Sequence, residues 1–384
     1  AADVQRAGKA LLGLSAKSLR DGHAQDRHWP LRVAEVAEAL HKTSPELAKW
    51  MLDAPDFGLP EHLLFVGPLK LDRAEAARKF VAKAKGDPKY QWTGGAVELL
   101  GALPRKDTDA LLLDLWKQGG LEDAVLRVLA LDPQPADRAK LAVGLKSLDA
   151  GLVRACAEAL AKFPPADAKE VALQGVRALK RFPDPKTDAA TRAAVVAMLE
   201  RVTGAKPGAD EKAWAAWLVK TYPESAKSLD ATDGFDAEGW KKRLAGIDWA
   251  RGDSEKGRAA FTKASCAACH DGGRAVGPSL LGVAKRFSRD DLLTATLQPS
   301  KDVPPRYRPT RITTTDDKSY TGIIVYEATD GVILQTGADT TVRIAGADVA
   351  TKKQVEVSLM PAGLLDKLTD AEIADLLAYL GALK

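Results

Sequence analysis

Helix-breaking residues recur through residues 1–230 and limit how this part of the chain can fold. Between the breaks, apolar side chains follow the period of an amphipathic helix. One such face joins Leu152, Val153, Cys156, Leu160 and Phe163. The breaks fall at Pro104, Gly119-Gly120, Pro133, Asp149, Pro164 and Pro183. Their spacing of roughly 15 to 19 residues fits a helix of about three turns followed by a turn.

Paired helices of this length predict a helix hairpin about every 30 residues. The segment Leu160-Ala-Lys-Phe-Pro164 is echoed by Leu179-Lys-Arg-Phe-Pro183, which supports an internal repeat. One hairpin cannot bury its apolar face alone, so stacking into a solenoid is the expected solution. Residues 1–230 resemble HEAT-like repeats, and an irregular helical bundle is the alternative.

Composition changes near residue 250. All eight Trp lie at or before Trp249, whereas Thr, Val and Ile cluster after residue 305. The sequence therefore predicts a linker over residues 231–250 and a second domain over residues 251–384.

The second domain carries the motif Cys266-Ala-Ala-Cys269-His270. This C-x-x-C-H pattern is the attachment signature of c-type haem. Two thiols three positions apart on a helical turn can each add to a vinyl group of one porphyrin, and His270 then lies beneath the iron as an axial ligand. We therefore expect one covalent haem c.

Two other interpretations of the motif are weaker. A zinc site needs a second pair of Cys or His ligands, and none is near in sequence. A thioredoxin-like redox pair needs a surrounding βαβ pattern, which the sequence lacks. The third cysteine, Cys156, lies on an apolar helix face and is expected to be a small buried side chain rather than part of a disulfide.

The flanks of the motif resemble class I cytochrome c. A helix bearing Gly257 and Phe261 precedes the motif, and a final helix bearing Tyr379 follows a Thr369–Glu372 capping box. The resemblance implies that these two helices cross.

The same resemblance implies the iron environment. The Pro278 carbonyl would accept the Nδ1–H of His270, which orients the ring, and Met360 would be the distal ligand. The alternative for Met360 is an ordinary core methionine. Other histidines could compete as distal ligand but lie far away in sequence: His23, His28, His41 and His62.

Residues 306–357 are expected to form a β insertion, because alternating residues are punctuated by polar turns and by Asp330-Gly331. The expected strands are Thr310–Thr315, Tyr320–Glu327, Val332–Gln335 and Thr340–Ile344. The expected fold is therefore mainly α: a HEAT-like α-solenoid followed by an all-α class I cytochrome c domain with a small β-sheet or barrel inserted.

The combined layout of residues 235–384 resembles a haem-binding domain family found typically in planctomycetes and verrucomicrobia. The matching features are the C-x-x-C-H motif, Gly277-Pro278-Ser279-Leu280, Tyr320-Thr321-Gly322 and the stretch Ser358–Leu365. Members often carry HEAT-like helices upstream, and many carry a dehydrogenase domain that this chain lacks. The chain is thus expected to be an excised fragment or a free-standing partner.

The expected function is single-electron transfer, as an electron carrier rather than an enzyme, with a periplasmic dehydrogenase or another redox protein as partner. A His270/Met360 pair leaves no open position on the iron. A haem enzyme or a gas or redox sensor is the alternative if Met360 is labile. A third possibility is an interaction module in which haem is mainly structural.

Charge and hydropathy set further expectations. The net charge is +4, from 56 basic and 52 acidic residues that are interspersed, so no nucleic-acid partner is expected. No apolar run approaches the roughly 20 residues of a transmembrane helix. The first residues do not resemble a signal peptide, and the expected periplasmic location comes from the family resemblance, with the leader already removed.

Overall fold

The computed structural model describes residues 2–20, 29–118, 120–165, 168–186, 188–226, 229, 237–270, 276–315, 319–336 and 341–384. These residues are mainly helical and include one five-stranded antiparallel sheet, which confirms the expected class. Contacts divide the chain into two compact units, Ala1–Lys117 and Gln118–Lys384. The predicted boundaries at 230 and 250 stay predictions, and part of the predicted linker lies outside the described residues.

The first unit is helical and is built around a cluster of buried apolar side chains. Leu47, Met51, Phe57, Phe65 and Phe80 are all almost fully buried in it. Its elements are α1 (Ala2–Arg20), α2 (Trp29–Thr43), α3 (Glu46–Asp53), the 3-10 helix η2 (Pro60–Phe65), α4 (Arg73–Gly86), α5 (Gly94–Leu99), the 3-10 helix η3 (Leu100–Ala102) and α6 (Arg105–Gln118).

His62 is part of this core. Its Nδ1 atom accepts hydrogen bonds from the backbone N–H groups of Gly58 and Leu59, both at 3.2 Å. Its ring stacks on Phe57, with centroids 5.7 Å apart, and lies beside Phe65. Burial, helped by the charge of a nearby lysine, lowers the pKa of His62 to about 4. The imidazole is therefore neutral in the folded protein at neutral pH.

The lowered pKa predicts a pH-dependent loss of stability in the first unit. An unfolded His binds a proton near pH 6.5, whereas folded His62 does so only near pH 4. The stabilisation is thus complete above about pH 6.5 and is lost as the pH falls toward 4. At pH 5 the opening free energy of residues 46–86, measured by hydrogen exchange, should be about 2 kcal/mol lower than at pH 7. His62→Asn keeps an acceptor but cannot titrate; an unchanged pH slope in this variant would contradict the assignment.

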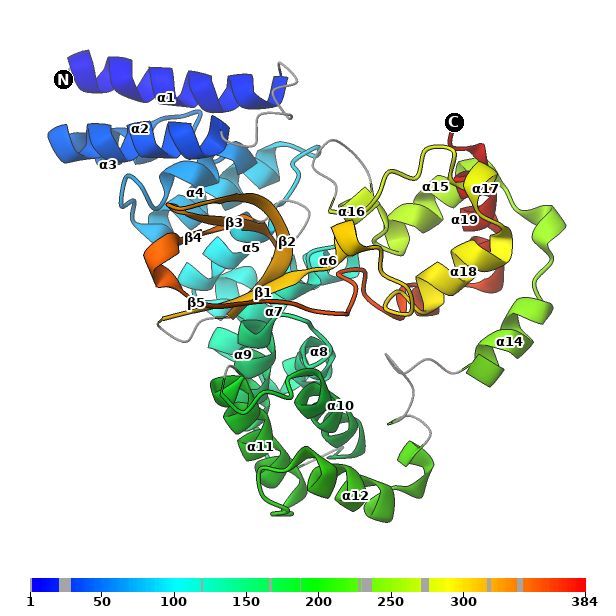
Figure 1. Cartoon of the computed structure of the whole chain (residues 1–384). Helices are drawn as coiled ribbons and strands as arrows, with labels where there is room; N and C mark the ends of the chain where they lie inside the picture. Colours follow the sequence, from blue (N-terminus) through cyan, green and yellow to red (C-terminus); the bar gives the residue numbers. More distant parts are fainter. Residues whose placement is uncertain are drawn as a thin grey trace. The chain divides into compact units, whose positions relative to one another are not determined.

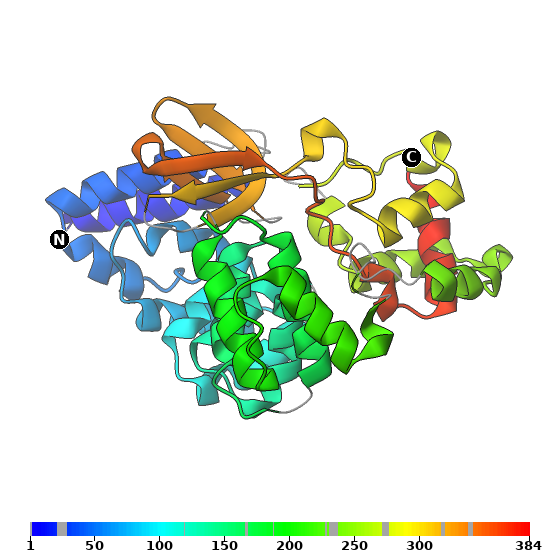
Figure 2. The same ribbon diagram turned by 60° about the horizontal axis from the view of Figure 1, so that its bottom comes forward.

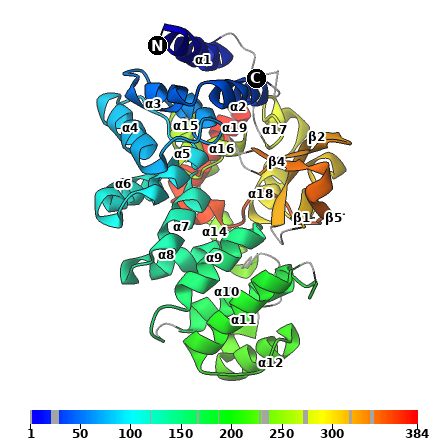
Figure 3. The ribbon, with the colours of Figure 1, turned by 90° about the vertical axis from the view of Figure 1, so that its left-hand side faces the viewer.

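The helices at the start of the second unit are separated at the predicted breaks. Pro133, Asp149, Pro164 and Pro183 each fall between two helices, and the Asp149 side chain caps α9 by accepting from Leu152 N–H at 2.8 Å. The helices are α7 (Glu122–Leu131), α8 (Arg138–Gly144), α9 (Ala150–Leu160), α10 (Ala168–Arg181), α11 (Ala189–Thr203) and α12 (Glu211–Thr221), with 3-10 turns η4 (Pro135–Asp137) and η5 (Pro223–Ser225). Figure 3 shows them following one another from α7 to α12.

Most of these helices pack both on the next helix in the chain and on the next but one. Helix α8 packs on α7 and α9, and α10 packs on α11. Helix α7 packs on α9 and α9 on α11, while α8 packs on α10 and α10 on α12. Cys156 is fully buried on α9, as expected, and is a free thiol. A Cβ atom added to Gly144 would lie 2.3 Å from the Cys156 Sγ atom, so α8 and α9 approach closely only because residue 144 has no side chain.

The sheet is a meander whose last strand returns to the first. Its strands are β1 (Thr310–Thr314), β2 (Ser319–Ala328), β3 (Gly331–Gln335), β4 (Thr341–Ala345) and β5 (Val349–Gln354), with the 3-10 turn η9 (Gly346–Asp348) before β5. The order is β4-β3-β2-β1-β5 (Figure 2). Ile312, Val332, Leu334 and Ile344 form its core. The four expected strands are confirmed within a few residues, whereas β5 was not expected.

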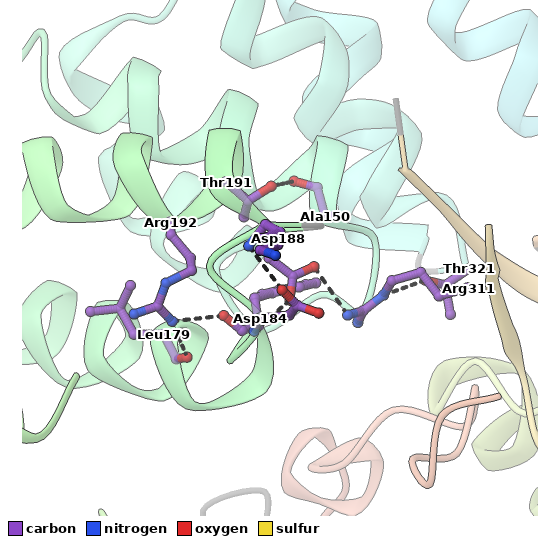
Figure 4. A network of polar contacts seen from close by, with 10 residues as sticks. Ala150, Leu179, Asp184, Asp188, Thr191, Arg192, Arg311 and Thr321 are labelled. Atoms are coloured by element: carbon purple, nitrogen blue, oxygen red, sulfur yellow. Dashed lines mark hydrogen bonds and ion pairs between the residues drawn. The ribbon is translucent and has the colours of Figure 1, made fainter. Parts of the chain in front are cut away.

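A buried ion pair joins the sheet to the helices of the second unit (Figure 4). Arg311 on β1 lies 3.3 Å from a carboxylate oxygen of Asp188, the residue that precedes α11, and the two side chains are 11% and 1% exposed. The guanidinium also stacks over the Phe182 ring at 4.6 Å, and Asp184 N–H donates to Asp188. Burial raises the pKa of Asp188 despite Arg311, so each charge depends on the other for compensation.

Breaking this pair should destabilise the second unit strongly. Arg311→Met leaves a buried, uncompensated carboxylate, and Asp188→Asn leaves an uncompensated guanidinium, so each should lower the free energy of unfolding by about 3–5 kcal/mol. The double variant should lose less than the sum of the two. Arg343→Met, in the exposed pair with Asp330, is the matched control and should cost no more than about 1 kcal/mol. Chemical denaturation measures all four; equal losses for Arg311→Met and Arg343→Met would contradict the prediction.

The remaining elements of the second unit are short helices around one long C-terminal helix. They are α14 (Ala237–Ala245), the 3-10 turn η7 (Trp249–Arg251), α15 (Ser254–Lys263), α16 (Ala267–His270), α17 (Val283–Arg286), α18 (Arg289–Leu297), the 3-10 turns η8 (Pro305–Tyr307) and η10 (Leu364–Lys367), and α19 (Asp370–Ala382). Helix α15 packs against α19 (Figure 1). Capping boxes begin α18 at Ser288 and α19 at Thr369.

Candidate functional site

The candidate site begins where α15 crosses α19. A Cβ atom added to Gly257 would lie 2.1 Å from the Asp375 carbonyl oxygen and 2.5 Å from the Tyr379 Cβ atom, so only glycine permits this approach. The rings of Phe261 and Tyr379 lie 5.4 Å apart at the crossing. The Asp253 N–H donates to the Asp375 carboxylate at 2.7 Å. The crossing expected from the sequence is therefore present, and it holds the end of α15 in place.

Adding a methyl group at this crossing should be costly. Gly257→Ala must push the two backbones apart and should lower the free energy of unfolding by about 3 kcal/mol. Gly381→Ala on α19 is the matched control, because a Cβ atom there meets nothing within 4 Å. Thermal unfolding of the two variants compares them directly, and a Gly257→Ala variant as stable as Gly381→Ala would refute the prediction.

The chain turns sharply after α15 to present the cysteines. Ser265 has a positive φ of 62°, and Cys266 N–H donates back to the Phe261 carbonyl at 3.0 Å. Cys269 and His270 N–H groups both donate to the Cys266 carbonyl, at 3.1 and 3.0 Å. Cys266, Cys269 and His270 therefore share one helical turn, as the spacing of the motif predicts.

Neither thiol of the motif forms a disulfide. Cys266 is 8% exposed, and Cys269 is partly buried. Burial raises the pKa of the Cys266 thiol to about 11. A thioredoxin-like pair works instead with a lowered thiol pKa. Within the described ranges, no strand lies before the motif or between α15 and α18, so a βαβ pattern is not present there. The site therefore does not favour the disulfide-exchange interpretation.

The segment that follows His270 contacts its ring and fixes its orientation. Its Nδ1 atom lies 2.8 Å from the Pro278 carbonyl oxygen, so Nδ1 carries the proton and donates it. A Cβ atom added to Gly277 would lie 2.6 Å from the ring Cε1 atom, and Gly277 N–H donates to the Cys269 carbonyl at 2.9 Å. Burial lowers the pKa of His270, and the bond to Pro278 partly opposes this shift. The neutral ring thus keeps its Nε2 lone pair available.

Met360 is positioned by a separate set of contacts. It lies between β5 and η10 and is partly buried. Its N–H donates to the Ser358 hydroxyl at 3.0 Å, and Ser358 N–H donates to the Ser300 hydroxyl at 3.2 Å, just beyond α18. The structure therefore brings Cys266, Cys269, His270 and Pro278 together and fixes the Met360 loop to the end of α18.

Three residues shape the site through contacts that were not predicted, although two of them lie in stretches that the family resemblance singled out. Gly277, Ser300 and Ser358 act through close approach or a hydroxyl contact. A Ser two residues before Met360 is a weak local signal for a turn, but nothing in the sequence points to Ser300. Among the competing histidines, His41 and His62 belong to the first unit, and His23 and His28 lie outside the described residues.

Comparisons with known proteins add no family. A scan against protein-family models finds no match, and neither does a search of curated proteins. Among the described residues, no group of three or more His, Cys, Asp or Glu side chains could hold a metal ion. No helix within the described ranges combines the length and apolar character needed to cross a membrane.

Proposed function

We propose that this chain is a monohaem c-type cytochrome that transfers single electrons. Haem c would be attached through Cys266 and Cys269, with His270 and Met360 as axial ligands. The observation that carries the proposal is the 2.8 Å contact between His270 Nδ1 and the Pro278 carbonyl, directly after a C-x-x-C turn. An axial His commonly donates its other ring N–H in this way.

The residues present fit a covalently held porphyrin. The helical turn holds Cys266 and Cys269 three positions apart, as two adjacent vinyl groups require. Neither cysteine forms a disulfide, so each keeps the thiol that a thioether bond requires. The Ser265 hydroxyl is buried beside Cys266 without a hydrogen-bond partner among the described residues, as expected next to a bound group with polar edges.

Each protein residue has a defined task at this site. The Pro278 carbonyl accepts the Nδ1–H of His270, which leaves the lone pair of Nε2 available to an iron ion. Gly277 leaves room for the ring, and the α15–α19 crossing fixes the start of the motif. Met360 would supply a soft thioether, which favours reduced iron. Haem c, when bound, supplies a one-electron couple between ferric and ferrous iron.

The helical part fits a docking or spacing scaffold. The alternating packing of α7, α9 and α11, and of α8, α10 and α12, supports an α-solenoid of stacked hairpins. Together with the family resemblance, this favours a class I cytochrome c domain attached to HEAT-like repeats. The proposed partner is a periplasmic dehydrogenase or another redox protein, and the proposed location is the periplasm.

Optical spectroscopy of the full chain tests the proposal. The chain is exported to the periplasm alongside a haem-ligation system, and its reduced spectrum and redox titration are recorded. A c-type spectrum with one reversible one-electron couple is expected. Rapid binding of cyanide or carbon monoxide by the native protein would favour a haem enzyme or sensor instead. Absence of a reversible couple would favour a structural haem, and absence of a porphyrin adduct would overturn the assignment.

A further inference from the structure

Two large apolar side chains are exposed on either side of one short helix that follows the candidate site in sequence. Leu281 is 62% exposed and Phe287 is 52% exposed, and they bracket the short helix α17. No other two exposed large apolar side chains in the described part of the chain share an element or its flanks. Single exposed apolar residues are ordinary, but two that flank the same short helix require an explanation.

These side chains belong to a firmly held segment rather than to a frayed one. Val283 is 4% exposed and anchors α17 in the core. Gly282 N–H donates to the Leu383 carbonyl at 3.0 Å, which ties the segment to the end of α19. Arg286 donates to the carbonyl oxygens of Leu281 and Ser279, at 3.1 and 3.3 Å. The segment that exposes Leu281 and Phe287 is therefore held in place by a buried side chain and by hydrogen bonds.

Positive charge lies between the two apolar side chains. Lys285 and Arg286 are both exposed on α17. The Arg286 side chain contacts neutral carbonyl oxygens, and within the described ranges neither residue forms an ion pair with an acid. The nearest acids in sequence are engaged: Asp290 pairs with Arg289 at 3.5 Å, and Asp291 accepts from Ser288. An apolar centre with a basic rim matches a partner with an apolar centre and an acidic rim.

The segment is also close in sequence to the candidate iron ligand. Leu281 follows Pro278, whose carbonyl bonds to His270, by three positions. Transient electron-transfer complexes bury less than about 1,200 Å² in total, so a small patch at their centre suffices. We propose that Leu281, Lys285, Arg286 and Phe287 form a docking face for an acidic electron-transfer protein. This inference rests on the proposed electron-transfer function.

Binding to an acidic redox protein tests the docking face without requiring haem. The probe is a strongly acidic plant-type [2Fe–2S] ferredoxin, titrated calorimetrically into the full chain with and without haem. Lys285→Glu should raise the dissociation constant about tenfold at low salt, and the difference should shrink at high salt. Lys353→Glu, which changes the net charge equally on the exposed strand β5, is the matched control and should change it less than about twofold.

The apolar part of the face has its own pair of variants. Phe287→Ser should weaken ferredoxin binding several-fold at every salt concentration, because its contribution is not electrostatic. Leu131→Ser, at a position 66% exposed at the end of α7, should leave binding unchanged. Equal effects of Lys285→Glu and Lys353→Glu, or no effect of Phe287→Ser, would overturn the docking face.

Two further measurements distinguish other possible binding partners of the docking face. A dimer in analytical ultracentrifugation that Phe287→Ser dissociates would show a self-interface instead. Binding to anionic lipid vesicles in place of ferredoxin would show a membrane surface. The redox titration separates the two proposals: a chain without a reversible couple that still binds ferredoxin through this face would retain the docking face and lose the electron-transfer function.

Discussion

Cys266→Ser/Cys269→Ser should be isolated without any covalently attached haem. Each thiol is the only group in its position that can form a thioether with a vinyl carbon, and serine does not replace it. The helical turn itself should form as before, because its hydrogen bonds run between backbone atoms. Mass spectrometry of the denatured protein should show the bare polypeptide, against a one-porphyrin adduct for the unchanged chain.

The third cysteine provides the control for this experiment. Cys156 is a free thiol buried between α8 and α9, outside the motif. Cys156→Ala should keep the full porphyrin adduct, although the lost side-chain volume lowers stability. A porphyrin adduct on the double serine variant, or its loss from Cys156→Ala, would show that the motif is not the attachment site.

Met360→Ala should lower the reduction potential by on the order of 100 mV or more, because a thioether ligand stabilises reduced iron and the choice of axial ligand sets much of the potential. The weak near-infrared sulfur-to-iron band of the oxidised protein should disappear. The open position should also let cyanide bind rapidly. Potentiometric titration with optical detection measures the potential and the band together.

Two further variants separate ligation from general disturbance. Met198→Leu changes a fully buried methionine of α11 and should leave the potential and the near-infrared band unchanged. Ser358→Ala keeps the sulfur but removes the acceptor of the Met360 N–H, so the band should weaken without being lost. An unaltered band in Met360→Ala would show that Met360 is not the sixth ligand. The enzyme or sensor interpretation would then again be an alternative.

Local signals in the sequence predicted the secondary structure well. Thr369 and Asp149 precede helices and cap them through contacts with the residue three positions later, so a short stretch of chain contains the whole interaction. The four strands with alternating apolar residues were predicted for the same reason. Strand β5 was not, because nearly all its residues are exposed and only its pairing with β1 makes it a strand.

Most of the candidate site was also visible in the sequence, because its chemistry is concentrated in a few adjacent positions. The C-x-x-C-H motif specifies both thiols and His270 together. The contact of Pro278 with His270 was expected only from the resemblance to class I cytochrome c. The tight fit of Gly277 against the His270 ring became apparent only from the fold, since a glycine gives no sign of what approaches it.

The sequence alone indicated where helices are broken between Pro104 and Pro183, and it contains the C-x-x-C-H motif on which the haem proposal rests. Both features depend on periodicity and on neighbours within a turn or two. Only the tertiary structure decided that Arg311 pairs with Asp188 and that Ser300 holds the Met360 loop. These contacts join residues 123 and 58 positions apart. Over such separations the chain has no local preference, and which groups meet follows from how whole elements bury their apolar faces.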